Sequence, residues 1–240
     1  MESNAHTDES WLIRDFESRL IRDLELIRRA AFHEAGHAAA IYLRNKQKQL
    51  PPVHFQITLK ALDCPKDNYF GFRSVGDDNF PSAIEGGLLI HSLPLAMIER
   101  ANYSVTEHDA YQAAFEADII NLLSGSLAEA KYVAICDDEP FNTRLVNINA
   151  LHNYGGASDL NKVYEYLGIQ DGSKHPEQLA RLFNKAFQFI NLPIHWKAIE
   201  RLADYILNNM ENKITYEESI AMLDWDINPK LIRQQLTTID

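Results

Sequence analysis

The feature that most constrains this chain is the segment His33-Glu34-Ala35-Gly36-His37, which lies in a strongly helical stretch. A helix turns about 100° and rises about 1.5 Å per residue, so side chains four positions apart lie on the same face. Both imidazoles can therefore reach a single ion, and Glu34 stands beside the open coordination position of that ion. The segment predicts a zinc site in which His33 and His37 are ligands and Glu34 is a general base acting on water.

The residues around this segment have helical spacing. From Trp11 to Leu43, apolar residues recur three or four positions apart, with charged residues between them. This spacing predicts an amphipathic helix, either one rod or two helices with a break near Arg29. Gly36 costs about 1 kcal/mol of helix propensity relative to alanine, so we expect a neighbouring group to approach its backbone closely. The alternative is that the motif occurs by chance and both histidines are ordinary core or surface residues.

The rest of the chain predicts a mainly α fold. Residues 53–59 alternate between apolar and polar side chains, which is typical of a strand with one buried face. Residues 69–75 are expected to return as a second strand. Further helices are expected after Thr106, with Ser124-Gly125 as a candidate interruption, after Asp159, and two or three times between Pro176 and Asp240. The expected fold is thus mainly α, with a small two- or three-stranded sheet beside the helix that carries the motif.

Length and charge restrict the classes of protein to consider. For 240 residues we expect a disordered segment of residues 1–10 and then one domain, residues 11–240, whose C-terminal helical part begins at about residue 176. The net charge of -11, without any dense basic block, excludes nucleic acid as an expected partner.

Cysteine usage and hydropathy bear on the compartment. Cys64 and Cys136 lack CxxC spacing, which favours a reducing compartment, and we expect a soluble cytoplasmic protein. The longest apolar stretch, residues 86–97, falls short of the roughly 20 residues that a spanning helix requires. No transmembrane segment is therefore expected.

A zinc site of this kind needs a third protein ligand. Ala40 and Leu43 occupy the positions at which the longer motif HExxHxxGxxH would place glycine and histidine. The third ligand is therefore expected from a distant part of the chain.

Several segments resemble the FtsH family of membrane-anchored, ATP-dependent zinc proteases. The residues AFHEAGHAAAIYL are similar to the metal-binding helix of that family, and PPVHFQITLKA is similar to the strand that follows it. Tyr69-Phe70-Gly71-Phe72 resembles the glycine-containing return, and Leu123–Glu129 resembles a helix with GGRAAEE character. The resemblance covers roughly residues 25–225 and implies an FtsH-peptidase-like helical zincin domain.

The resemblance also implies roles for particular residues. Gly155-Gly156-Ala157-Ser158-Asp159 is similar to the family's GAxND segment, which makes Asp159 the third ligand of one zinc ion per chain. The alternative for Asp159 is a helix cap or first-turn acid after a glycine pair. Glu129 is the alternative ligand, or an acid that supports a ligand or the structure. Residues Tyr69, Phe70, Gly71 and Phe72 become an edge strand against which a substrate polypeptide lies.

The chain also departs from the family pattern. No Gly-x-x-x-x-Gly-Lys-Ser/Thr segment occurs, so we expect a zinc endopeptidase that acts on unfolded or flexible polypeptides without its own ATPase. A separate ATPase or adaptor is a candidate partner, and the sequence does not fix the oligomeric state. Ser126, Ala130 and Ser158 replace the family's Arg, Glu and Asn, and the connections 76–110 and 137–155 are longer. These departures motivate the alternative function, a catalytically inactive zinc-binding module with a regulatory or adaptor role.

Overall fold

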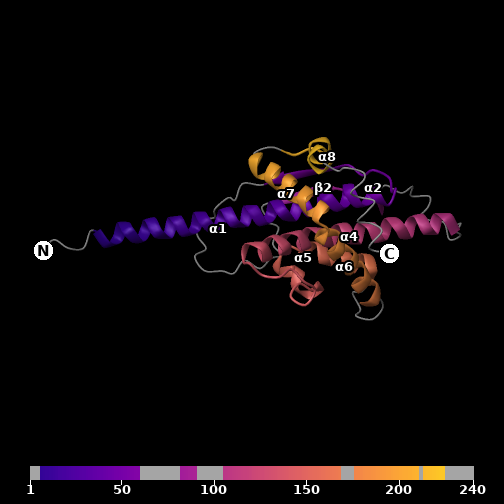
Figure 1. Ribbon diagram of the computed structural model, residues 1–240, viewed down its shortest axis with the longest axis horizontal. Helices are drawn as coiled ribbons and strands as arrows, with labels where there is room; N and C mark the ends of the chain where they lie inside the picture. Colours follow the sequence, from indigo (N-terminus) through magenta and orange to yellow (C-terminus); the bar gives the residue numbers. More distant parts are fainter. Residues whose placement is uncertain (1–5, 60–81, 91–104, 169–175, 211–212, 225–240) are drawn as a thin grey trace.

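The computed structural model describes residues 6–59, 82–90, 105–168, 176–210 and 213–224 (Figure 1). Helix α1 (His6–Ala39) is continuous past Arg29, so of the two arrangements that the sequence left open the structure has the single rod. The helix begins at His6, within residues 1–10, for which the sequence predicts disorder. A π-helical turn, Ala40–Arg44, and the short helix α2 (Asn45–Gln47) extend it before Pro51-Pro52.

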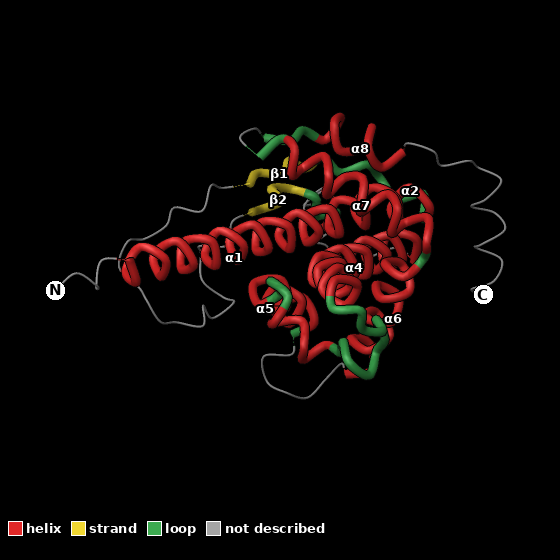
Figure 2. The backbone as a smooth tube through the Cα atoms, turned by 60° about the vertical axis from the view of Figure 1, so that its left-hand side comes forward, coloured by secondary structure: helices red, strands yellow, loops and turns green. Residues whose placement is uncertain are grey.

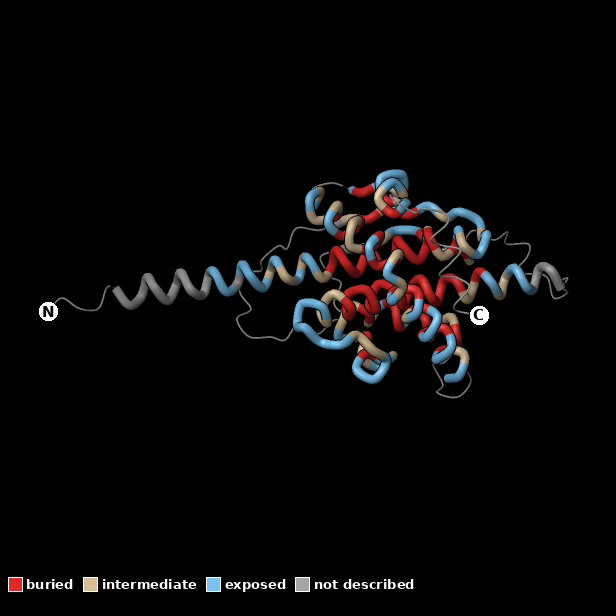
Figure 3. Tube along the Cα trace, in the orientation of Figure 1, coloured by how far each residue is buried: buried red, intermediate tan, exposed pale blue. Residues whose placement is uncertain are grey.

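The two halves of α1 have different surroundings. Residues 30–40 are buried, whereas Leu20 is 49% exposed, Ile21 67% and Leu24 47%. Figure 3 shows this division, with the N-terminal half of the helix standing away from the body of the protein. The half that carries the predicted metal ligands is therefore the half that is fixed by packing.

Helix α4 (Val105–Cys136) is the partner against which this half packs. The candidate interruption Ser124-Gly125 does not break this helix; the two small residues lie where α1 crosses it closely. A Cβ at position 36 would lie 2.5 Å from the Cβ of Ala128 and 2.6 Å from the carbonyl oxygen of Ser124. The predicted close approach to Gly36 is thus confirmed, and it explains a glycine within a helix.

One helix of the described residues, Asp109–Cys136 within α4, is long and apolar enough to cross a membrane by length and composition alone. Of its most apolar window, 78% is buried inside the protein, as is usual for a core helix. This helix is longer than residues 86–97, which the sequence indicated as the longest apolar stretch.

The sheet has two described strands, which lie along α1 (Figure 2). Strand β1 (Phe55–Leu59) pairs antiparallel with β2 (Ser82–Gly86), with Ile57 opposite Ile84. On the other side of β1, Ile57 exchanges backbone hydrogen bonds of 2.9 Å with Ile214. The first strand is the predicted one. Strand β2 was not predicted, because its sequence, Ser82-Ala83-Ile84-Glu85-Gly86, contains a single large apolar residue and shows no alternation. The expected return strand, residues 69–75, lies outside the described residues.

The remaining helices complete the core. Helix α5 (Ala157–Leu167) follows a 3₁₀-helix, Ile148–Asn153, and starts directly after the glycine pair. Then come α6 (Pro176–Asn191), α7 (Pro193–Asn208) and α8 (Tyr216–Asp224), the amphipathic C-terminal helices that the sequence predicts. The described residues thus form a mainly helical fold with a small antiparallel sheet, as expected.

A buried histidine in α7 makes stability depend on pH. His195 is 3% exposed; its Nδ1 donates to the carbonyl oxygen of Phe189 (2.9 Å), and its Nε2 accepts from Gln47 (2.9 Å). Burial lowers the pKa of His195 to about 4 from the ordinary 6.5, although the bond to Phe189 acts in the opposite direction. The ring is therefore held neutral in the folded protein.

Between pH 6.5 and pH 4, the unfolded chain binds a proton at His195 that the folded protein does not bind. Stability should accordingly fall as the pH is lowered, by about 2 kcal/mol from this residue between about pH 7 and pH 5. Urea unfolding at both pH values measures the change. A His195→Gln variant should lose less stability over this window, and an equal loss in both proteins would contradict the assignment.

Candidate metal centre

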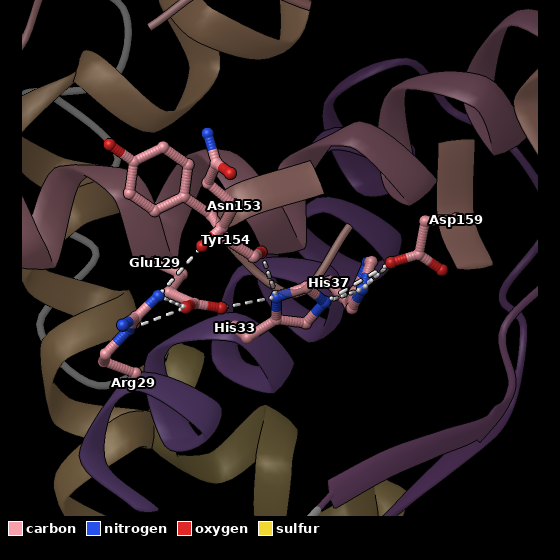
Figure 4. Close-up of polar contacts among 7 residues, drawn as sticks. All are labelled: Arg29, His33, His37, Glu129, Asn153, Tyr154 and Asp159. Atoms are coloured by element: carbon pink, nitrogen blue, oxygen red, sulfur yellow. Dashed lines mark hydrogen bonds and ion pairs between the residues drawn. The ribbon is translucent and has the colours of Figure 1, made fainter. Parts of the chain in front are cut away.

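The structure brings three predicted ligands together in the interior. His33, His37 and Asp159 are 3%, 4% and 8% exposed, and α1 supplies the first two while α5 supplies the third. The Nε2 atoms of the two histidines are 3.0 Å apart. One oxygen of Asp159, Oδ2, lies 3.3 Å from Nε2 of His33 and 3.2 Å from Nε2 of His37. Figure 4 shows the three side chains pointing toward one another.

These separations fit a zinc ion. Zinc bonds to nitrogen and oxygen are about 2.0–2.2 Å long, and a tetrahedral arrangement places such ligand atoms about 3.3–3.5 Å apart. The distances of 3.0–3.3 Å among Nε2, Nε2 and Oδ2 are close to this spacing. A small ion held by all three side chains would therefore need little movement of the protein.

The hydrogen bonds behind the rings orient both histidines for a cation. Nδ1 of His37 donates to the carbonyl oxygen of Asn121 (2.8 Å). Nδ1 of His33 donates to the carbonyl oxygen of Tyr154 (3.2 Å) and to Oε2 of Glu129 (3.1 Å). A neutral imidazole that donates from Nδ1 has a lone pair on Nε2. Two such lone pairs 3.0 Å apart repel each other unless a proton or a cation lies between them.

The charges around His33 also call for a cation. Burial opposes the imidazolium form, but the carboxylates of Asp159, Glu129 and Glu34 outweigh it and raise the pKa of His33 well above its ordinary value. Burial likewise opposes ionisation of Asp159, but the two imidazoles hold the pKa of this carboxyl far below its usual range. Both shifts have one physical origin, the attraction between the protonated imidazoles and the buried carboxylates, so the site favours a positive charge between these side chains.

Glycines make room for the rings. A Cβ on Gly125 of α4 would collide with the ring of His37. A Cβ on Gly155 would lie 2.8 Å from Nδ1 of His33 and 2.9 Å from Oε2 of Glu129, and the φ of this residue is +71°. Only glycine takes up this space and this backbone conformation without strain. The glycine pair before α5 thus allows the segment that delivers Asp159 to lie against His33.

The other predicted site residues are placed as follows. Glu34 is 3% exposed, next to His33 on the same helix. Glu129 is 1% exposed and contacts Nδ1 of His33, so it supports a histidine from behind and lies on the opposite side of the ring from Nε2. The predicted substrate-binding residues Tyr69, Phe70, Gly71 and Phe72 lie outside the described residues.

The structure adds contributions that the sequence did not reveal. Arg29 binds Glu129, the carbonyl oxygens of Asn121 and Tyr154 accept from the histidines, and Gly125 clears the ring of His37. Only Arg29 has a signal in the sequence, because it precedes His33 by four positions and so shares its helix face. The carbonyl oxygens have none.

Comparisons with protein-family models, with curated proteins and with solved structures give no match. The function is therefore inferred from the geometry of this site.

Proposed function

We propose that this chain is a zinc-dependent endopeptidase with one zinc ion, held by His33, His37 and Asp159. The observation that carries the proposal is the convergence of the three ligand atoms, which all lie within 4.8 Å of one another. Glu34 directly follows the first ligand, His33, on α1. The buried position of all three ligands supports a built site over a chance group of surface residues.

Each residue has a separate task in the proposed reaction. The two imidazoles and Asp159 would leave the fourth position of zinc open to water and substrate. When bound, zinc supplies a Lewis acid that polarises the peptide carbonyl and lowers the pKa of the attacking water towards about 7. Glu34 accepts a proton from that water as its oxygen attacks the carbonyl carbon. Glu34 then gives the proton to the leaving nitrogen as the carbon–nitrogen bond breaks.

The fold proposed for this function is that of the FtsH peptidase domain. The mainly helical body, the motif on a long helix, the small sheet beside it and the late aspartate after a glycine pair support this proposal. The expected substrates are unfolded or flexible polypeptides, and a separate ATPase or adaptor would supply folded ones. We propose the cytoplasm as the location.

Metal content and proteolysis together test the function. Protein purified without a metal-affinity tag should contain about one zinc ion per chain and hydrolyse an unfolded casein-like substrate. A chelator should remove both the zinc and the activity, and added zinc should restore both. The absence of zinc, even after incubation with zinc, would contradict the proposal.

The same experiment identifies the second candidate function. Ser126 and Ser158 stand where the resembled family has Arg and Asn, and Ser126 lies directly against Gly156 of the glycine pair before α5. This observation favours a regulatory or adaptor module that binds zinc without catalysis. Such a module would retain one zinc ion per chain and show no hydrolysis.

A further inference from the structure

We propose that Arg29 is a positioning residue that sets zinc affinity by locking Glu129 against His33. This inference rests on the proposed zinc site but not on catalysis. Arg29 precedes His33 by one helical turn on α1, at the point where the exposed half of the helix enters the body. Its side chain is 27% exposed, so it reaches from solvent into the site.

The guanidinium of Arg29 holds the carboxylate of Glu129 in place. Its Nε and Nη2 atoms lie 2.8 Å and 2.7 Å from Oε1 of Glu129, while the other oxygen, Oε2, accepts from Nδ1 of His33 at 3.1 Å. The two oxygens thus have different partners, and the carboxylate bridges the guanidinium and the imidazole (Figure 4). Two donors on one oxygen leave the carboxylate little freedom to rotate.

Arg29 also binds the segment that leads to the third ligand. Nη2 of Arg29 donates to the carbonyl oxygen of Asn153 (3.0 Å), and the next carbonyl, that of Tyr154, accepts from His33. Gly155-Gly156 and then Asp159 follow directly. One side chain therefore joins the three elements that form the site, namely α1, α4 and the segment before α5.

The direction in which zinc affinity changes when Arg29 is removed distinguishes a positioning role from a purely electrostatic one. Glu34, Glu129 and Asp159 bring three buried carboxylates to the site, and a divalent ion together with Arg29 neutralises them. If Arg29 acted only through its charge, its removal would reduce repulsion of the cation and tighten zinc binding. If it positions Glu129 and His33, its removal weakens zinc binding, because partners behind a metal ligand typically contribute about 10- to 100-fold in affinity.

The test is the zinc dissociation constant, measured by competition with a chromophoric chelator. For Arg29→Met we expect a constant about tenfold or more above that of the wild type. Arg29→Lys keeps the charge but not the fork of donors, and should restore part of the affinity. The matched control is Arg28→Met, which removes the same charge from the neighbouring exposed position and should leave the constant unchanged.

A double variant tests whether Arg29 acts through Glu129. In a Glu129→Gln background, Arg29→Met should have a smaller effect than in the wild type, because residues that act as a unit are not additive. The melting temperature of the zinc-free proteins shows whether each variant folds. Zinc binding that is equal or tighter in Arg29→Met would overturn the inference and leave the zinc site in place. A wild-type protein that binds no zinc would overturn both proposals.

Discussion

Glu34→Gln is expected to keep one zinc ion per chain and to lower the hydrolysis of an unfolded polypeptide on the order of 1000-fold. Glutamine has nearly the shape of glutamate, so the buried side chain should still fit beside His33. It cannot accept a proton from the attacking water, and the general base is lost. The decisive measurement is kcat on an unfolded casein-like substrate, with the zinc content of each sample determined in parallel.

The matched control is Glu17→Gln, the same substitution at an exposed position of the same helix, which should retain full activity. Equal activity in the Glu34→Gln and wild-type proteins would remove Glu34 from the reaction. Loss of zinc together with activity would instead make Glu34 a determinant of metal binding.

Asp159→Ala is the second large effect: we expect the zinc dissociation constant to rise on the order of 100- to 1000-fold. Structural zinc sites have about 10–16 kcal/mol of binding free energy spread over four ligands, so one ligand contributes roughly 2.5–4 kcal/mol. Elemental analysis after dialysis and chelator competition both report the loss. Circular dichroism should show helix content close to that of the wild type.

This variant also distinguishes the two roles open to Asp159 from the sequence. In the structure α5 has Gly156 at its N-cap, with Asp159 in the first turn and its Oδ2 directed at both histidines. A residue that served only the helix end would alter stability by about 0.3–1 kcal/mol and leave zinc bound. Glu165→Ala, an exposed acid later in the same helix, provides the control and should leave zinc affinity unchanged.

Local patterns were sufficient to predict much of the helical fold. The spacing of apolar residues around His33 indicated a helix, because that signal arises from neighbours in the sequence, and Gly36 indicated a close approach whose partner, α4, only the structure identifies. Strand β2 was not recognised, because Ile84 is the only large apolar residue of Ser82–Gly86, so the segment shows no alternation, and its pairing with β1 is a tertiary event.

The candidate site was predicted unevenly for a similar reason. His33, Glu34 and His37 form a local motif, and Asp159 was proposed from a resemblance, whereas the Arg29–Glu129 pair joins positions 100 residues apart. The carbonyl oxygens of Asn121 and Tyr154 belong to the backbone, so side-chain identity says nothing about them. The collision that Gly125 avoids becomes visible only when His37 has been placed against α4.

The continuity of α1 has a mechanical consequence. An unbroken helix has no hinge, so residues 17–24 outside the body and the imidazoles inside it form one rigid lever. The fulcrum is the contact of Gly36 with Ser124 and Ala128, where the two helices nearly touch. From Ile21 to His33 the lever is about 18 Å long at 1.5 Å per residue. A load on the outer arm would thus tilt both histidines relative to Asp159, which belongs to a different helix.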